Sequence, residues 1–149
     1  MSETAISAAQ LEALWNRHLD GEFQSKDVEA TLATMVEDAS VLHVPVNTGG
    51  RGRAALRAFY RDDFIFCMPD DFRVATTNRV VGAGQLVDEV RVTFTHTCAM
   101  PWMLPDRVPT GRAVDVMMVV VVQFQGDKLA HERIYWDHAG VLRQLGVQA

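Results

Sequence analysis

The hydrophobic and polar positions of the chain change their period about halfway along its length. In the first half, apolar side chains recur at three- and four-residue spacing, which predicts helices after Ser7 and after Asp27 and a third over residues 54–66. Serine and aspartate commonly cap helix N-termini through their side-chain oxygens. Between the second and third helices, residues 39–45 predict one strand, followed by a glycine-rich turn at residues 47–52.

Beyond the third helix, the pattern takes the two-residue period of β-strands. It predicts four long strands joined mostly by glycine-containing turns, over residues 71–81, 86–97, 112–125 and 128–137, and then a short C-terminal helix. Helices followed by consecutive hairpin-connected strands are typical of an α+β fold. We therefore expect one domain over residues 1–149, with a curved antiparallel sheet wrapped around the N-terminal helices.

The strand patterns of residues 86–97 and 112–125 differ in how many faces they are expected to bury. In residues 86–97, alternate positions form a largely apolar row that should face the helices: Asp88, Val90, Val92, Phe94 and His96. Asp88 lies too far along this strand to contact His96, so we expect it at the surface or at a turn. Residues 112–125 are apolar on both faces, which favours a homodimer through the outer face of the sheet.

Composition and charge exclude several classes of protein. The chain has 149 residues, a net charge of −5 and an isoelectric point near 5.4, which argues against nucleic-acid binding and against a polybasic membrane surface. Its longest apolar run, residues 116–122, is shorter than the roughly 20 residues of a membrane span. Cys67 and Cys98 form no disulfide or zinc pattern, and no secretory signal is visible, so we expect a cytoplasmic protein with reduced thiols.

Three stretches of the sequence resemble the nuclear transport factor 2-like superfamily, and within it the SnoaL-like branch. They are DASVLHVP with TGGRGRAALRAFY, then FTHTCAMPWMLPDRVPTGR, and GDKLAHERIYWDHAGVLRQLG. The resemblance implies a cone-shaped curved sheet around helices, a cystatin-like α+β barrel, with an apolar pocket inside. Similar proteins are isomerases, cyclases, dehydratases, epoxide hydrolases and non-catalytic binding modules, so the fold leaves the activity open.

His43 and His96 are the first candidate proton acceptors. His43 precedes Pro45 in a strand similar to the one that carries the acidic base of ketosteroid isomerases, and imidazole can accept a proton near neutral pH. His96 ends the apolar row of residues 86–97, which is expected to line the pocket. For both residues the alternative is a histidine held structurally by hydrogen bonds.

The segment HERIYWDH divides into two faces of one strand. One face carries most of the ionisable groups: His131, Arg133, Tyr135 and Asp137. The other carries one acid and two large apolar groups: Glu132, Ile134 and Trp136. The resemblance places an acidic or polar residue near the end of the last strand in the pocket. We therefore expect His131, Tyr135 and Asp137 inside and the Glu132 face outside.

Several further side chains are expected to contact a ligand. They lie on the predicted helices, on residues 86–97 and in the proline-rich loop 99–109, which could cover the pocket or contact a second subunit. The set is Trp15, His18, Tyr60, Phe64, Val92, Phe94, Met100, Trp102 and Leu104. Three of the histidines, His43, His96 and His131, have no recognised ligand spacing, and we expect neither a metal nor a cofactor.

These residues predict cofactor-independent acid/base chemistry on a small hydrophobic metabolite that contains a carbonyl group. The reaction would be isomerisation, aldol-type cyclisation or dehydration. His43 or His96 would take the proton, and Asp137 with Tyr135 or Tyr60 would stabilise the oxyanion or return the proton.

Two alternative functions remain open from the sequence. One is a non-catalytic ligand-binding or dimerisation module. The other is hydration of an epoxide, as in limonene epoxide hydrolase-like members of the superfamily, to which Arg133 and Asp137 would contribute. If His43, His96 and Asp137 do not approach one cavity, the enzymatic interpretation of these three residues fails.

Overall fold

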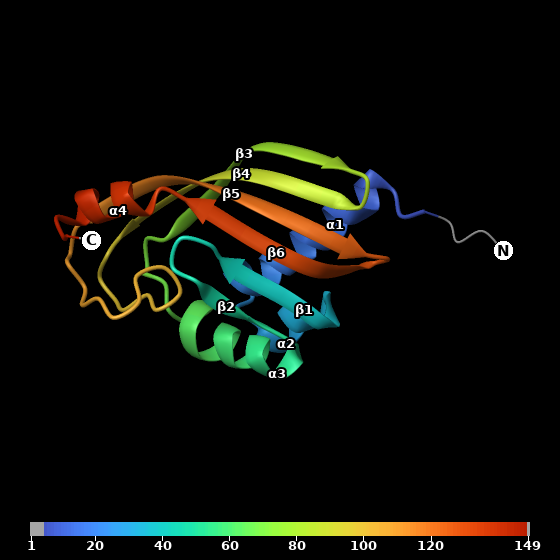
Figure 1. The fold of residues 1–149 in the computed structure, drawn as a ribbon, viewed down its shortest axis with the longest axis horizontal. Coiled ribbons are helices and arrows are strands. Elements are labelled where there is room, and N and C mark those ends of the chain that lie inside the picture. The colour runs from blue at the N-terminus through green and yellow to red at the C-terminus, as the bar shows by residue number, and fades with distance from the viewer. Residues whose placement is uncertain (1–4, 149) are drawn as a thin grey trace.

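A computed structural model describes residues 5–148, which form one curved, unclosed sheet with helices α1 to α3 packed against it (Figure 1). The strand order is β2-β1-β6-β5-β4-β3. The strands are β1 (Met35–His43), β2 (Thr48–Arg51), β3 (Arg73–Gly82), β4 (Gln85–Thr95), β5 (Ala113–Gln125) and β6 (Lys128–Trp136). The helices are α1 (Ala8–Leu19), α2 (Val28–Ala33), α3 (Arg53–Ala58) and α4 (His138–Leu145).

The predicted helix starts are confirmed by their caps. The Ser7 hydroxyl accepts a hydrogen bond from the Gln10 amide at 3.1 Å, and the Gln10 side chain accepts one from the Ser7 amide at 2.8 Å. Asp27 caps α2 by accepting from the amide of Ala30 at 3.0 Å. Two helices then continue as π-helical segments, η1 (Asp20–Gln24) and η2 (Phe59–Phe64), a geometry often found at functional sites.

The sheet differs from the expected antiparallel arrangement at one place. Strand β1 pairs in parallel with β6, while every other neighbouring pair is antiparallel. A parallel pair needs a long crossover, and here the crossover consists of β2, α3, η2 and strands β3 to β5. The glycine-rich segment predicted as a turn also contains a strand, β2, which forms the edge beside β1.

The faces of β4 and β6 decide which side chains enter the core. On β4 the predicted inner row is buried, but Asp88 is fully buried with it, so its expected surface position is wrong. On β6 the inner face carries Glu132, Ile134 and Trp136, which contradicts the predicted parity. The physical reason is that burying Ile134 and Trp136 stabilises the fold through their large apolar area, whereas Tyr135 is 42% exposed.

The proline-rich loop after β4 belongs to the core. Met100, Trp102 and Leu104 are buried, and the Trp102 indole nitrogen donates to the carbonyl of Cys67 at 3.1 Å. The Thr48 hydroxyl donates to the Trp102 carbonyl at 2.5 Å, which ties the loop to β2. Among the residues that the structure describes, no helix is long and apolar enough to cross a membrane.

Gly49 provides a test of the β1–β2 register. Its φ is +131°, and a Cβ atom at this position would lie 1.9 Å from the carbonyl oxygen of Val41. Gly49→Ala should therefore lower the free energy of unfolding by about 2 kcal/mol or more in a denaturant titration. Gly82→Ala is the matched control, because nothing lies within 4 Å of the Cβ atom that this substitution would add. Equal stability of the two variants would contradict the close approach of β1 and β2.

Candidate active site

A cavity of about 60 Å³ lies between α1, η1 and the inner face of the sheet. This volume corresponds to about two water molecules at roughly 30 Å³ each. Rings and aliphatic groups form most of the wall, and the rings are those of Trp15, Phe23, His43, Phe64, Phe72 and Trp102. Three carboxyl groups also reach the wall: Glu22, Asp88 and Glu132.

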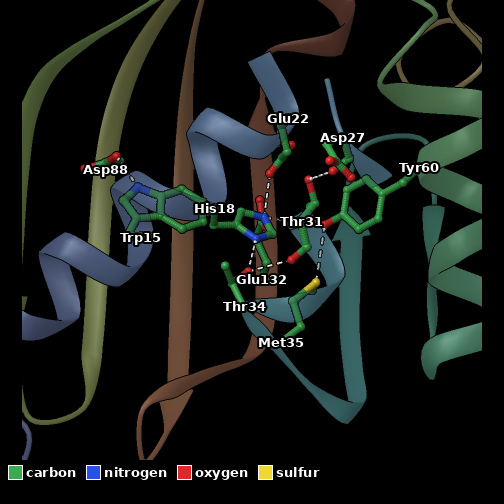
Figure 2. A network of polar contacts seen from close by, with 10 residues as sticks. All are labelled: Trp15, His18, Glu22, Asp27, Thr31, Thr34, Met35, Tyr60, Asp88 and Glu132. Carbon is green, nitrogen blue, oxygen red and sulfur yellow. Dashed lines mark hydrogen bonds and ion pairs between the residues drawn. The ribbon is translucent and has the colours of Figure 1, made fainter. Parts of the chain in front are cut away.

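Two of these carboxyl groups meet His18 behind the cavity wall (Figure 2). The Nε2 atom of His18 lies 2.5 Å from Oε1 of Glu22 and 3.4 Å from Oε2 of Glu132. His18 and Glu22 lie one turn apart on the continuous helix formed by α1 and η1, and Glu132 comes from β6. All three side chains are buried, so a histidine and two acids converge where water is largely excluded.

The other ring nitrogen of His18 is fixed by a threonine. The Thr34 hydroxyl donates to the carbonyl of Thr31 at 2.6 Å, so it can only accept from His18 Nδ1, which lies 2.8 Å away. His18 Nδ1 therefore carries a proton, and Nε2 is the atom that shares a proton with the acids. The Tyr60 hydroxyl lies 3.5 Å from Nε2 and donates to the sulfur of Met35 at 3.7 Å.

Burial and mutual attraction shift the pKa values of this cluster. Burial by itself lowers the pKa of His18, but Glu22 and Glu132 outweigh it and raise this pKa to about 10. Burial raises the pKa of Glu22 to about 7, although His18 opposes the shift. Burial, with Glu22 and Glu132, also raises the pKa of Tyr60. Near neutral pH His18 is therefore a cation, and Glu22 exists in both protonated and ionised forms.

Asp88, the third carboxyl group, is neutralised by a separate set of contacts. It accepts from the Trp15 indole nitrogen at 2.7 Å and from Arg79 Nε and Nη2 at 2.5 and 2.9 Å. Arg79 also binds Glu12 and Asn16 on α1, each at 3.0 Å. Trp15 in turn stacks on His18 with ring centroids 5.3 Å apart. Asp88 therefore positions the wall of the cavity and holds α1 against β3 and β4.

His43 lines the cavity as predicted, but its surroundings do not suit a base. Its ring lies between 5.2 and 5.9 Å from four aromatic rings, those of Phe59, Phe64, Trp102 and Trp136. Its Nδ1 atom is buried without a hydrogen-bond partner in the described part of the chain. Burial lowers the pKa of His43 to about 3, so the ring is neutral at pH 7 and far from the pKa that proton transfer near neutral pH favours.

The remaining predicted catalytic residues do not reach the cavity. His96 is buried at a turn, where its Nδ1 accepts from the amide of Thr110 at 3.2 Å. His131 lies on the outer face of β6, where its Nδ1 atom is 2.7 Å from the Ser40 hydroxyl, and Tyr135 is exposed on the same face. Asp137 caps α4 by accepting from Gly140 at 2.9 Å. The predicted convergence of His43, His96 and Asp137 on one cavity is therefore wrong, and Arg133 with Asp137 does not form a buried hydration site.

The predicted ligand-contacting residues divide into three groups. Trp15, Phe64, Val92 and Trp102 line the cavity. His18 and Tyr60 lie behind the carboxyl groups rather than on the wall. Three others are buried in the core and do not line it, because the loop and β4 direct them elsewhere: Phe94, Met100 and Leu104.

Sequence reasoning missed Glu22 and Glu132, the two acids of the site. The four-residue spacing of His18 and Glu22 on a predicted helix was a usable signal, since it places both side chains on one helix face. For Glu132 the signal was its position on the same strand face as Ile134 and Trp136, two large apolar residues.

The side chains of His18, Glu22 and Glu132 carry donor atoms of the kinds that bind metal ions. Atoms of His18, Glu22 and Glu132 lie within 4.8 Å of one another. Two ligands of one zinc ion, each about 2.0–2.2 Å from the metal, lie roughly 3 Å or more apart. The 2.5 Å contact of His18 with Glu22 is shorter and has the length of a hydrogen bond. As arranged, the three groups fit a shared proton better than a metal ion.

Comparison with solved structures supports the fold. Among solved structures, a protein from a Jannaschia species described as a SnoaL-like polyketide cyclase superposes with a TM-score of 0.78 at 18% identity, covering 100% of this chain and 99% of the other. A nuclear transport factor 2-like protein from Burkholderia xenovorans gives 0.69 at 16% identity, covering 95% and 99%. A protein of ketosteroid isomerase-like fold from Catenulispora acidiphila, solved with trimethylamine, gives 0.67 at 13% identity, covering 91% and 93%.

The sequence itself identifies the family. No curated protein matches the chain. The family model of the SnoaL-like domain matches residues 15–132, which include the C-terminal end of α1, the whole of β1 to β5 and Glu132 on β6. The match covers most of the chain and agrees with the fold of the solved structures. The chain therefore belongs to the SnoaL-like domain family.

Proposed function

We propose that this protein is an enzyme that transfers protons on a small hydrophobic substrate without a cofactor, with Glu22 as the exchanging acid and base. The observation that carries the proposal is the position of the Glu22 carboxyl group, which lines a mostly apolar cavity and contacts the buried His18. Burial raises the pKa of Glu22 to about 7, where a group can both accept and donate a proton. The polyketide cyclase described among the similar structures is consistent with this class of chemistry.

Glu22 would carry the proton during such a reaction. Ionised Glu22 would take a proton from the carbon beside a substrate carbonyl, and the new carboxyl group would return it to a second carbon or to a leaving hydroxyl. Isomerisation, aldol-type cyclisation and dehydration all use this exchange. His18 stays protonated because its pKa is raised to about 10, so it holds Glu22 and offsets Glu132 rather than exchanging protons with the substrate.

The size of the cavity restricts the part of the substrate that reacts. A larger outer basin of about 570 Å³ adjoins the cavity and shares five wall residues with it: Leu19, Phe23, Phe72, Val74 and Thr76. The rings of Phe23 and Phe72 stack with centroids 6.1 Å apart where the two spaces meet. A substrate would place its reacting group beside Glu22 and its remaining atoms past these rings, in the basin.

A second candidate function is the non-catalytic binding of a small hydrophobic ligand. The observation that favours it is the cavity volume of about 60 Å³, which is small for a cyclic substrate unless Phe23 or Phe72 moves. Ligand binding of this kind needs the apolar wall but not the proton exchange of Glu22, so the two functions separate in a proton-exchange assay.

We also propose that two copies of the chain associate through the outer face of the sheet. Met117 on β5 is 49% exposed and Tyr135 on β6 is 42% exposed, and Val119, two residues after Met117, is the register partner of Tyr135. Burying these apolar groups against a second copy would remove them from water, the main favourable contribution to association.

The catalytic proposal predicts a specific loss of proton exchange. With acetone and cyclopentanone as probes in D₂O, the protein should speed deuterium incorporation beside the carbonyl, measured by NMR. Glu22→Gln should lower this rate about 100-fold or more, because the exchanging group is lost. Glu89→Gln, an exposed glutamate on the outer face of β4, is the control and should keep the rate. Equal rates in the two variants would refute the role of Glu22.

Glu22 also predicts a pH dependence of stability. Its pKa rises from 4.5 to about 7 on folding, so its contribution is complete below pH 4.5 and is lost as the pH rises to about 7. The difference in unfolding free energy between the wild type and Glu22→Gln should fall over this range by a few kcal/mol. Groups whose pKa falls on folding, such as His43, have the opposite pH dependence, but they are present in both proteins and cancel in this difference. Urea titrations from pH 4 to 8 measure it, and a flat difference would show that Glu22 is not shifted.

The proposed dimer predicts that one charge on the outer sheet face separates the subunits. Met117→Glu should weaken association at least tenfold, about 1.4 kcal/mol, in sedimentation velocity over a concentration series. Val108→Glu is the control, since Val108 is exposed in the loop before β5 and not on the sheet. A wild type that sediments as a monomer at all concentrations would exclude this interface.

A further inference from the structure

We propose that the inner cavity binds a small alkylammonium cation, which sits among the aromatic rings and replaces the proton of Glu22. Binding of this kind needs no turnover, so it goes beyond the proposed function and shares with it only the ionised form of Glu22. Three properties of the cavity lead to this ligand: its aromatic wall, its charge and its size.

The wall is rich in aromatic rings, which attract a positive charge. Two indole and three phenyl rings border the cavity: Trp15, Phe23, Phe64, Phe72 and Trp102. Aromatic faces attract ammonium groups electrostatically, and alkylated ammonium ions also gain from the apolar contact of their methyl groups. The ring of His43 does not repel a cation, because burial lowers its pKa to about 3 and keeps it neutral.

The charges around the cavity leave one negative charge without a partner. Asp88 is paired with Arg79, and the single positive charge of His18 faces both Glu22 and Glu132. When both acids are ionised, the cluster therefore keeps one uncompensated negative charge. Among the described residues that line the cavity, none is a lysine or an arginine that could balance it.

Two buried carboxyl oxygens share a single donor. Oε1 of Glu22 and Oε2 of Glu132 both contact Nε2 of His18, at 2.5 and 3.4 Å, and have no other partner in the described part of the chain. One N–H group cannot fully satisfy two carboxylates, so a ligand N–H group would supply the hydrogen bond that is missing. Figure 2 shows both acids directed at the same side of the His18 ring.

The cavity limits the size of the cation. At about 60 Å³ it has room for roughly two water molecules, so it suits methylammonium best, and further methyl groups would extend toward the outer basin. The outer basin gives a route of entry, since Leu19, Phe23 and Phe72 border both spaces.

The charge of the ligand determines how its binding responds to pH. The groups facing Glu22 are His18 on α1, Glu132 on β6 and Tyr60 on η2, and Asp88, which is paired with Arg79, also lines the cavity. Because a cation binds the ionised form of Glu22, it releases a proton, and its affinity rises with pH through about 7. A neutral carbonyl ligand that accepts a hydrogen bond from protonated Glu22 would show the opposite trend.

The experiment is a calorimetric titration of the full-length protein with methylammonium, dimethylammonium and trimethylammonium chloride at pH 6, 7 and 8 and constant ionic strength. These ions stay protonated throughout this range, so only the protein changes its charge. The affinity for the preferred ion should rise about tenfold from pH 6 to pH 8. At pH 6, titrations in buffers of different ionisation enthalpy should show release of most of one proton.

Matched controls separate charge from shape. The neutral molecule tert-butanol should bind at least tenfold more weakly than the preferred ion at pH 8. Glu22→Gln should remove the rise with pH and weaken binding at least tenfold, while Glu89→Gln should behave as the wild type. If Glu22→Gln does not fold, the proton release of the wild type remains a sufficient test.

Several results would overturn the proposal. They are the absence of saturable binding of all three ions, equal affinity for tert-butanol, and an affinity that falls as the pH rises. None of these depends on deuterium exchange with ketones. An enzyme that exchanges protons but binds no cation would therefore retain the proposed function and lose only the cation site.

Discussion

The contact of His18 with Glu22 and Glu132 is the interaction on which the rest of the structure depends. Moving a single charge out of water costs several kcal/mol, so neither the histidine nor the acids would be stable in this interior alone. The pairing becomes possible because η1 continues α1 and carries Glu22 to the same end of the helix as His18, while β6 turns Glu132 inward. The helix and the sheet are thus joined by charge as well as by apolar packing.

The charges in this cluster are unequal in number, and this imbalance determines the chemistry of the cavity. One cation faces two acids, and burial, with a smaller contribution from Glu132, keeps Glu22 partly protonated near neutral pH while His18 stays charged. Asp88 also lines the cavity, but its pairing with Arg79 adds no second uncompensated charge there. A proton and a small organic cation are both ways of balancing the one charge that remains. Proton transfer and cation binding therefore arise from the same electrostatic arrangement.

Much of the fold follows from local patterns that act over a few residues. The caps at Ser7 and Asp27 start helices where their side chains can bond the first free amides, which requires no tertiary contact. The apolar row of β4 likewise predicts its buried face. The parallel pairing of β1 with β6 was not predictable in this way, because it joins segments separated by most of the chain. The burial of Asp88 depended on its hydrogen bonds with Arg79 and Trp15, which no local pattern connects with it.

The sequence by itself determined the helices, most of the strands, the family and five of the residues that line the cavity wall: Trp15, His43, Phe64, Val92 and Trp102. Only the tertiary structure decided which face of residues 131–137 lies inside. Alternation along a strand divides side chains into two sets, but it does not say which set is buried. That choice depended on the packing of Ile134 and Trp136 and on a buried histidine from α1 that could balance the charge of Glu132.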